Sequence, residues 1–141
     1  MGRPKYDRRS GLKRFGFVGA LMAGVTALAG QAAAEGDAAK GEKLFKGYLR
    51  CSICHSLEAG EMKVGPTLDG LFGRKAGSVE GFKHYSKAMV NSEVVWDEET
   101  LSKFLKNPKK YILETKMDFC GVISDQQRAD LIAYLKEATA Q

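Results

Sequence analysis

Apolar residues recur at the spacing of an α-helix in three parts of the chain. They are Gly41, Leu44, Phe45, Tyr48 and Leu49, then Leu101, Phe104 and Leu105, and finally Leu131, Ile132, Leu135 and Ala138. Each group follows a residue whose side chain can cap the first turn of a helix: Asp37, Asp97 and Ser124. Ser124 and Gln127 also have the spacing of a capping box. The pattern predicts three main helices, and the alternation that is typical of strands is absent.

The segments between these helices are predicted to be loops and short helices. Residues 56–81 are rich in glycine, contain Pro66 and have no sustained period. A short helix is predicted over residues 86–91, and Asn107-Pro108 is predicted to end the second main helix. The fold class is therefore all-α with long loops. A connection of about 25 residues without structure is unusual in a compact domain, so this loop is expected to wrap a large apolar group.

The first 34 residues have the pattern of a secretory signal peptide. A basic start precedes an uncharged apolar stretch, residues 15–30, and then Ala32 and Ala34, the small residues that signal peptidase requires. The 16 residues of the apolar stretch are fewer than the roughly 20 that a bilayer requires. We predict cleavage after Ala34, which leaves residues 35–141 as one domain; a retained membrane anchor is the alternative. Arg8-Arg9 also occurs in signals for the export of folded proteins, but its surroundings match them imperfectly.

The charge of the chain changes when this segment is set aside. The whole chain has 22 basic and 17 acidic residues, a net charge of +5. Six of the basic residues and one of the acidic residues lie in residues 1–34, which leaves 16 of each and no net charge in residues 35–141. A nucleic-acid partner is therefore not expected. A local cluster of lysines remains: Lys103, Lys106, Lys109, Lys110 and Lys116.

Cys51, Cys54 and His55 form a Cys-x-x-Cys-His motif. A structural zinc site needs four such ligands, usually as two close pairs, and residues 35–141 offer no second pair. A redox dithiol is expected beside a βαβ pattern, which is not found in this chain. Attachment of haem needs two thiols and an imidazole from one segment. The motif, the signal peptide and the long loop together favour haem c.

If His55 binds one face of the haem iron, the opposite face needs a ligand of its own or a water molecule. The candidates are His84, a methionine and a lysine. Met62 and Met89 are equally compatible with positions in a loop or in the core. Met117 follows the second main helix and its proline, far enough along the chain to return over the opposite face. The residue pattern alone leaves this choice open.

Residues 35–141 contain, in this order, the segments GDAAKGEKLF, CSICH, KVGPTLDGLFGRKAG, WDEETL, NPKKYI, TKM and RADLIAYLKEAT. Together these segments resemble the class I cytochrome c family, which includes mitochondrial cytochrome c and its soluble bacterial relatives. The resemblance covers essentially all of residues 35–141. It implies a small fold in which three main helices, short helices and long loops wrap one covalently bound haem c. It also implies that the first and last helices cross, with contacts among Gly41, Phe45, Leu131 and Tyr134.

The resemblance implies roles for individual residues as well. Cys51 and Cys54 would bind the haem covalently, while His55 and Met117 would be the axial ligands of its iron. The Pro66 carbonyl would accept a hydrogen bond from the His55 ring. The remaining residues of the haem environment, expected around the buried propionates, are Arg74, Tyr85, Trp96 and Thr115.

Four features depart from the family pattern. Two extra residues precede Cys51, which predicts a small bulge at the end of the first helix. Leu113-Glu114 replaces the usual Pro-Gly before the methionine, and Phe104 replaces a tyrosine that commonly donates a hydrogen bond toward the methionine sulfur. Cys120 replaces a small apolar residue, and we expect its side chain to be buried. The alternative is an exposed, reactive thiol.

An iron with both axial positions filled has no open site for a substrate, so we expect an electron carrier and not an enzyme. The resemblance implies a monomeric protein of the periplasm, or a membrane-anchored one if the signal peptide is retained. It would take electrons from a quinol-oxidising cytochrome bc-type complex and pass them to a terminal oxidase, a photosynthetic reaction centre or a reductase. The clustered lysines would dock on acidic partners. The alternatives are peroxidase-like activity through a labile Met117, a small haem sensor, or a fixed subunit of a larger oxidoreductase.

Overall fold

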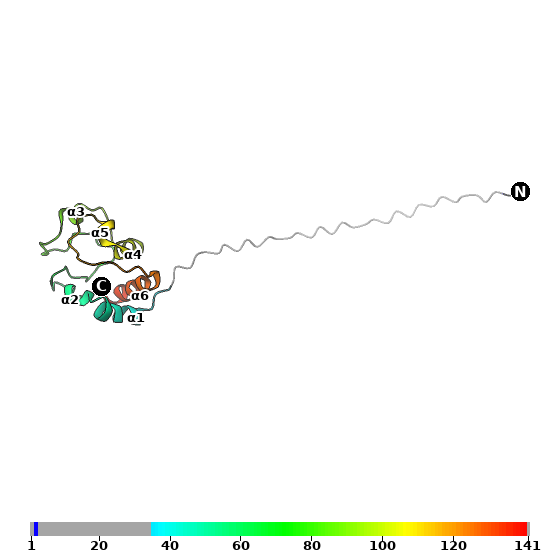
Figure 1. Cartoon of the computed structure of the whole chain (residues 1–141), viewed down its shortest axis with the longest axis horizontal. Helices are drawn as coiled ribbons and strands as arrows, with labels where there is room; N and C mark the ends of the chain where they lie inside the picture. The colour runs from blue at the N-terminus through cyan, green and yellow to red at the C-terminus, as the bar shows by residue number, and fades with distance from the viewer. Residues whose placement is uncertain (1, 3–34, 141) are drawn as a thin grey trace. The chain divides into compact units, whose positions relative to one another are not determined.

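Helices joined by long loops make up the described part of the chain. The computed structural model describes Gly2 and residues 35–140, so the prediction of a signal peptide falls on residues outside the described ones, apart from Gly2. In chain order the helices are α1 (Ala38–Lys43), the π-helix η1 (Leu44–Tyr48), α2 (Cys51–Cys54), α3 (Lys87–Val90), α4 (Glu98–Lys106), α5 (Pro108–Tyr111) and α6 (Asp125–Ala138) (Figure 1). Between residues 35 and 140 there is no strand, only an isolated β-bridge between Lys75 and Val95. The predicted all-α fold is confirmed.

The helices begin where the sequence predicts. Each predicted cap accepts a hydrogen bond from the backbone N–H three residues later, at 3.0 Å for Asp37, 2.7 Å for Asp97 and 3.3 Å for Ser124. Ser86 caps α3 in the same way, at 3.1 Å. These bonds satisfy N–H groups that have no partner within the helix. At Asp97 the Thr100 hydroxyl also accepts the Asp97 N–H (2.8 Å) and completes a capping box, whereas at Ser124 only the first bond forms.

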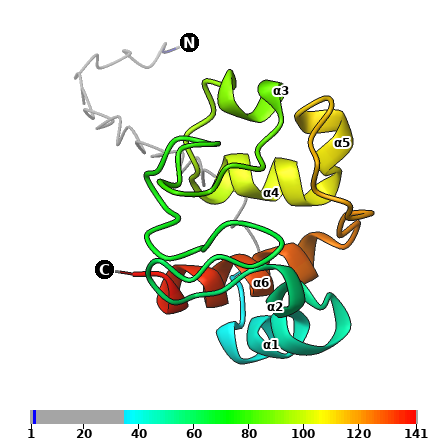
Figure 2. The same cartoon turned by 90° about the vertical axis from the view of Figure 1, so that its left-hand side faces the viewer.

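A glycine allows α1 to cross α6 closely (Figure 2). A Cβ atom at Gly41 would lie 2.0 Å from the Asp130 carbonyl oxygen and 2.7 Å from the Tyr134 Cβ, so no larger residue fits without moving a backbone. The rings of Phe45 and Tyr134 meet beside this point, with centroids 5.6 Å apart. Leu131 is 1% exposed and belongs to the same core. The predicted crossing of the first and last helices is confirmed.

The two extra residues before the cysteines widen the end of the first helix. The Leu49 N–H donates to the Leu44 carbonyl at 2.9 Å, which is the five-residue spacing of a π-helix. Arg50 then takes a left-handed conformation, with φ 55°, at the start of α2. The predicted bulge is confirmed, and it leaves Tyr48 79% exposed.

The connection after His55 has no helix before α3, as predicted. Part of it is held by a short backbone pairing that the apolar pattern does not predict. The Trp96 N–H donates to the Arg74 carbonyl (2.9 Å), and the Gly73 N–H donates to the Trp96 carbonyl (2.8 Å). This pairing fixes the middle of the long loop against the segment that leads into α4.

The short helix α5 was also not predicted. Asn107-Pro108 ends α4 as expected, but the same two residues start α5. The Asn107 side chain accepts a hydrogen bond from the Lys110 N–H (3.0 Å), and the proline occupies the first helical position, where its missing N–H has no cost. One pair of residues therefore serves as a stop signal and a start signal.

Two buried charged side chains anchor α6. Arg128 is 5% exposed, and its guanidinium donates to the carbonyls of Val122 (2.6 Å) and Ile123 (2.7 Å). Asp130 is 4% exposed and accepts the Asp37 N–H (2.8 Å). Buried charges need such partners because they have lost their hydration. Arg128 therefore holds the segment before α6, and Asp130 holds the start of α1 against α6.

Candidate functional site

A cavity of about 820 Å³ brings together distant parts of the chain. Its lining includes residues of η1, α2, α4 and α6 and of the loops between them. Much of the wall is apolar, with contributions from Phe45, Leu71, Met89, Trp96, Leu101, Phe104, Leu105, Leu131 and Leu135. A volume of this size is typical of a site for a small molecule or cofactor. The long loop and the helices therefore enclose space for a large apolar group.

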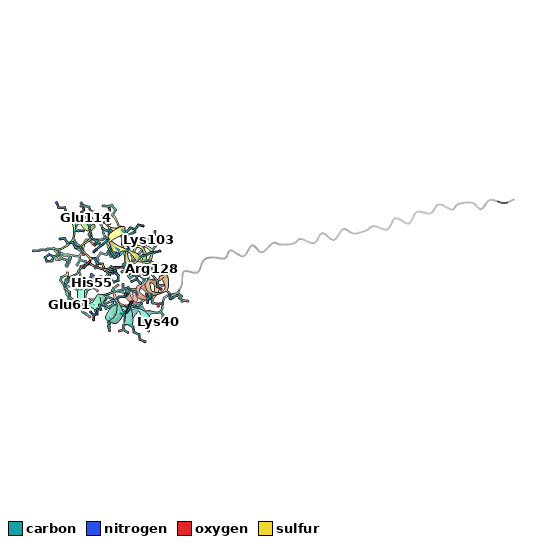
Figure 3. The ribbon with its side chains drawn as sticks, viewed as in Figure 1. Lys40, His55, Glu61, Lys103, Glu114 and Arg128 are labelled. Carbon is teal, nitrogen blue, oxygen red and sulfur yellow. The ribbon has the colours of Figure 1, made fainter. Side chains whose placement is uncertain are left out.

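The residues that the sequence predicted to contact a haem or its iron all line this cavity. They are Cys51, Cys54, His55, Pro66, Arg74, Tyr85, Trp96, Thr115 and Met117. In Figure 3 His55 is labelled near the middle of the domain, whereas Glu114, three residues before Met117, is labelled at its edge. The fold thus assembles in one place a set that is spread over most of residues 51–117.

One of the two motif cysteines, Cys51, is unsuited to act as the nucleophile of a redox dithiol. Both thiols are free and partly buried in the cavity wall. Burial raises the pKa of Cys51 to about 11, so this thiol stays protonated at neutral pH. A catalytic dithiol needs the opposite shift, because the thiolate is the nucleophile. The surroundings of Cys51 therefore argue against a dithiol site.

The geometry around His55 determines which ring nitrogen carries the proton. The His55 Nδ1 lies 2.8 Å from the Pro66 carbonyl oxygen, which can only accept, so Nδ1 carries the proton and Nε2 keeps its lone pair. Burial lowers the pKa of His55 and favours the neutral ring. Gly65 makes this approach possible: a Cβ atom there would lie 2.4 Å from the ring carbon Cε1. Sequence reasoning missed Gly65, although its position directly before the acceptor proline is a signal for close backbone approach.

Met117 reaches the cavity from a loop with little regular structure. Its N–H donates to the hydroxyl of Thr115 (3.3 Å), which is itself buried. Phe104 lines the cavity where the family pattern has a tyrosine, so no hydroxyl is available from that position. Of the other candidates for the opposite face, His84 and Met89 also line the cavity, whereas Met62 does not.

Arg74 and Tyr85 provide polar groups in the otherwise apolar wall. The Arg74 guanidinium donates to the carbonyls of Asp69 (2.5 Å) and Thr67 (3.1 Å). Burial lowers the pKa of Arg74 and raises the pKa of Tyr85. A guanidinium has five N–H donors, so Arg74 has donors left for an anionic group in the cavity.

The clustered lysines do not form one uniform cationic surface. Two of them pair with carboxylates: Lys103 with Glu99 (2.5 Å) and Lys109 with Asp118 (2.8 Å). Lys106, Lys110 and Lys116 form no ion pair with any described residue. Of the five, only Lys116 lines the cavity.

Residues near the motif add to the mouth of the cavity and were not predicted. Ile53 and Val64 line the cavity although they are 60% and 77% exposed, so they lie where it meets solvent. Arg50 and Lys63 line it as well and bring positive charge to the same place. The sequence signal that could have indicated this mouth was Ile53, an apolar residue between the two cysteines of the motif.

Cys120 is exposed, so the prediction that its side chain is buried is wrong. The close contact at this point is made by the next residue. Gly121 has φ 98°, and a Cβ atom there would lie 2.4 Å from the Lys106 carbonyl oxygen. Because the glycine approaches the end of α4, the neighbouring cysteine side chain is left in solvent.

Among the described residues, no group of three or more His, Cys, Asp or Glu side chains is arranged to hold a metal ion. None of the described helices has the length and apolar character needed to span a membrane.

Comparison with known proteins decides the family. The sequence profile described as cytochrome c matches residues 38–139. The chain belongs to the cytochrome c family. Similar proteins, each named cytochrome c, include one from Sesamum indicum, 53% identical over 106 residues (74% of this chain and 93% of that protein). Others come from Gossypium barbadense, 51% identical over 111 residues (78% and 97%), and from Chlamydomonas reinhardtii, 53% identical over 106 residues (74% and 92%).

Membership of the cytochrome c family establishes the cofactor and the general activity. Cytochromes c are electron-transfer proteins with one covalently bound haem c, and they exchange electrons with redox partners at membranes. This cytochrome c is therefore a haem electron carrier and not an enzyme. Its residues fit the group: the cavity is apolar and large, two thiols stand in its wall, and the oriented imidazole of His55 is beside them.

The predicted location in a periplasm is wrong. The similar cytochromes c come from flowering plants and a green alga, which are eukaryotes and have no periplasm. The prediction assumed a bacterial cell. The order of basic, apolar and small residues in the first 34 residues cannot establish that assumption. Such an order is typical of a segment that directs transport across a membrane, but it does not identify the compartment that the protein reaches.

Proposed function

We propose that Cys51 and Cys54 bind the haem through thioether bonds and that His55 and Met117 are its axial iron ligands. The observation that carries the proposal is that all four side chains line one apolar cavity. The haem, when bound, supplies reversible one-electron transfer at its iron.

The chain's own residues prepare this site for a six-coordinate iron. The hydrogen bond to Pro66 and the lowered pKa of His55 keep the ring neutral, with Nε2 able to bind a metal. A thioether from Met117 would favour the ferrous state, and the apolar lining would exclude water and favour it further. With both axial positions filled, the site is suited to electron transfer alone.

The polar part of the cavity supports the same arrangement. We propose that Arg74, Tyr85, Trp96 and Thr115 hold the propionate end of the haem. Arg74 has guanidinium donors left after its bonds to the two carbonyls, and an indole N–H and two hydroxyls are further donors. A buried carboxylate requires such hydrogen bonds.

We infer that the protein carries electrons from a cytochrome bc-type complex to a terminal oxidase, a reaction centre or a reductase. Docking would use the lysines predicted from the sequence, Lys103, Lys106, Lys109, Lys110 and Lys116, together with Arg50 and Lys63 at the cavity mouth. The exposed Ile53 and Val64 would contact the partner directly. This arrangement fits a partner with an apolar centre and an acidic rim. We also propose that residues 1–34 are a leader that is removed after Ala34.

Intact mass spectrometry under denaturing conditions tests attachment and processing together. We expect the mass of residues 35–141 plus one haem, because only covalent bonds survive denaturation. Joint Cys51→Ser and Cys54→Ser substitution should remove the haem mass. Cys120→Ser is the control, because Cys120 does not line the cavity, and it should retain the haem. Haem retained by the double variant would contradict the attachment, and a chain that begins at Met1 would contradict the removal of the leader.

A further inference from the structure

The loop that contains Met117 has little internal support. We call residues 113–121 the Met117 loop. Glu114 takes a left-handed conformation, with φ 61°, which is unfavourable for any residue with a Cβ atom. Leu113 beside it is 71% exposed, so packing does not hold this turn. Leu113-Glu114 also lacks the rigidity of a Pro-Gly turn.

Hydrogen bonds tie the ends of the loop and leave its middle almost free. The Thr115 N–H donates to the Ile112 carbonyl (3.2 Å), and the Val122 N–H, directly after the loop, donates to the Leu105 carbonyl (2.8 Å). Met117 and Phe119 pack partly on the core. From residue 116 to 121, one described hydrogen bond connects the loop to another element. It runs from Lys109 Nζ to Asp118 Oδ1, at 2.8 Å.

This contact closes the loop around its functional residue. Lys109 is in α5, before the strained turn, and Asp118 directly follows Met117. We propose that the Lys109–Asp118 ion pair is a positioning contact that holds Met117 in its place over the cavity, compensating for the missing turn. The inference rests on the proposed function, because it takes Met117 as an iron ligand.

The size of the ion pair's contribution and its dependence on salt follow from the exposure of the two side chains. The side chains of Lys109 and Asp118 are 61% and 95% exposed. An exposed pair contributes modestly, so its loss should shift the opening of the Met117 loop by roughly twofold to fivefold. Because salt screens exposed charges, the contribution should disappear at high ionic strength.

The chain provides a matched control pair. Lys103 and Glu99 lie 2.5 Å apart with side chains 56% and 76% exposed. Both residues belong to α4, so their pair closes no loop. Glu99→Gln and Asp118→Asn therefore remove the same kind of charge from pairs of similar exposure, and only the second touches the Met117 loop.

The experiment uses imidazole as a probe that competes with Met117 in the oxidised holoprotein. Binding is followed through loss of the sulfur-to-iron charge-transfer band, at low salt and at about 1 M salt, where the screening length is about 3 Å. At low salt we expect Asp118→Asn to bind imidazole roughly twofold to fivefold more readily than wild type. Glu99→Gln should match wild type. At high salt all three proteins should converge.

Lys109→Gln provides a second route to the same contact. It should reproduce the effect of Asp118→Asn, and the double variant should show no further increase, because both substitutions remove one interaction. Additive effects, or equal behaviour of Asp118→Asn and Glu99→Gln at low salt, would overturn the positioning contact while leaving the proposed function intact. Absence of the charge-transfer band in wild type would instead overturn Met117 as the ligand.

Discussion

At the scale of single residues, surroundings separate the chemistry of the three cysteines. Cys51 and Cys54 are in the cavity wall, and burial raises the pKa of Cys51 to about 11. Cys120 is exposed. Reaction of a thiol requires access and some thiolate. Cys120 is therefore the cysteine expected to react with external reagents once the other two are bound to haem.

Maleimide labelling tests this assignment. The folded holoprotein should take up one equivalent of a bulky maleimide rapidly, because the Cys120 thiol is open to solvent. Cys120→Ala should abolish the labelling. A gel without reductant should show a disulfide-linked dimer after oxidation of wild type and none after oxidation of the variant. Slow labelling that becomes rapid only in denaturant would show that Cys120 is buried in solution.

At the scale of helices, glycine decides where backbones meet. Gly41 stands where α1 crosses α6, with the Asp130 carbonyl oxygen 2.0 Å from the position of a Cβ atom. Gly47 is in η1, with nothing within 4 Å of the same position. The two glycines lie six residues apart in neighbouring helices, yet one is required by packing and the other is not.

Alanine at these two sites should have opposite effects on stability. Gly41→Ala should lower the free energy of unfolding by about 1–3 kcal/mol or more, because an added methyl group forces α1 away from α6. Gly47→Ala should raise it by up to about 1 kcal/mol, since alanine has the higher helix propensity and meets no neighbour. Chemical denaturation followed by far-UV circular dichroism measures both. A Gly41→Ala variant as stable as Gly47→Ala would mean that the close crossing is not formed.

At the scale of the whole molecule, the positions of the charged residues matter more than the net charge. Residues 35–141 have 16 basic and 16 acidic residues, yet Arg50, Lys63 and Lys116 all line the cavity. Lys40 is on α1 and does not line the cavity. Figure 3 shows Lys40 on a different part of the domain from Lys103. A partner that approaches the cavity mouth would therefore meet a positive local field despite the zero total.

The rate of electron transfer to an acidic membrane partner should depend on the positive residues at the cavity mouth. We expect the second-order rate to fall as salt rises, because the screening length is about 8 Å at physiological ionic strength. Lys116→Glu should lower the rate at low salt by on the order of tenfold. Lys40→Glu changes the net charge equally and should leave the rate close to wild type. Stopped-flow kinetics with purified partner complexes measures both, and equal effects would indicate that only total charge matters.

The sequence by itself determined the features that depend on neighbours in the chain. The caps at Asp37, Asp97 and Ser124 were predicted correctly because a cap bonds to a backbone N–H three residues away. The Cys-x-x-Cys-His motif was recognisable because its residues are adjacent. The bulge before the cysteines was predicted from a count of residues, and the structure resolves it as η1.

Only the tertiary structure decided the features that depend on distant parts of the chain. Whether Cys120 is exposed, whether Gly65 touches the ring of His55 and which partner Lys109 finds are all consequences of how loops pack. The burial of Arg128 was equally hidden, since its Nε donates to the hydroxyl of Ser102 (3.2 Å), which lies in α4, far from Arg128 in the sequence. Burial and close approach are set by long-range packing, and a local pattern of residues does not contain that information.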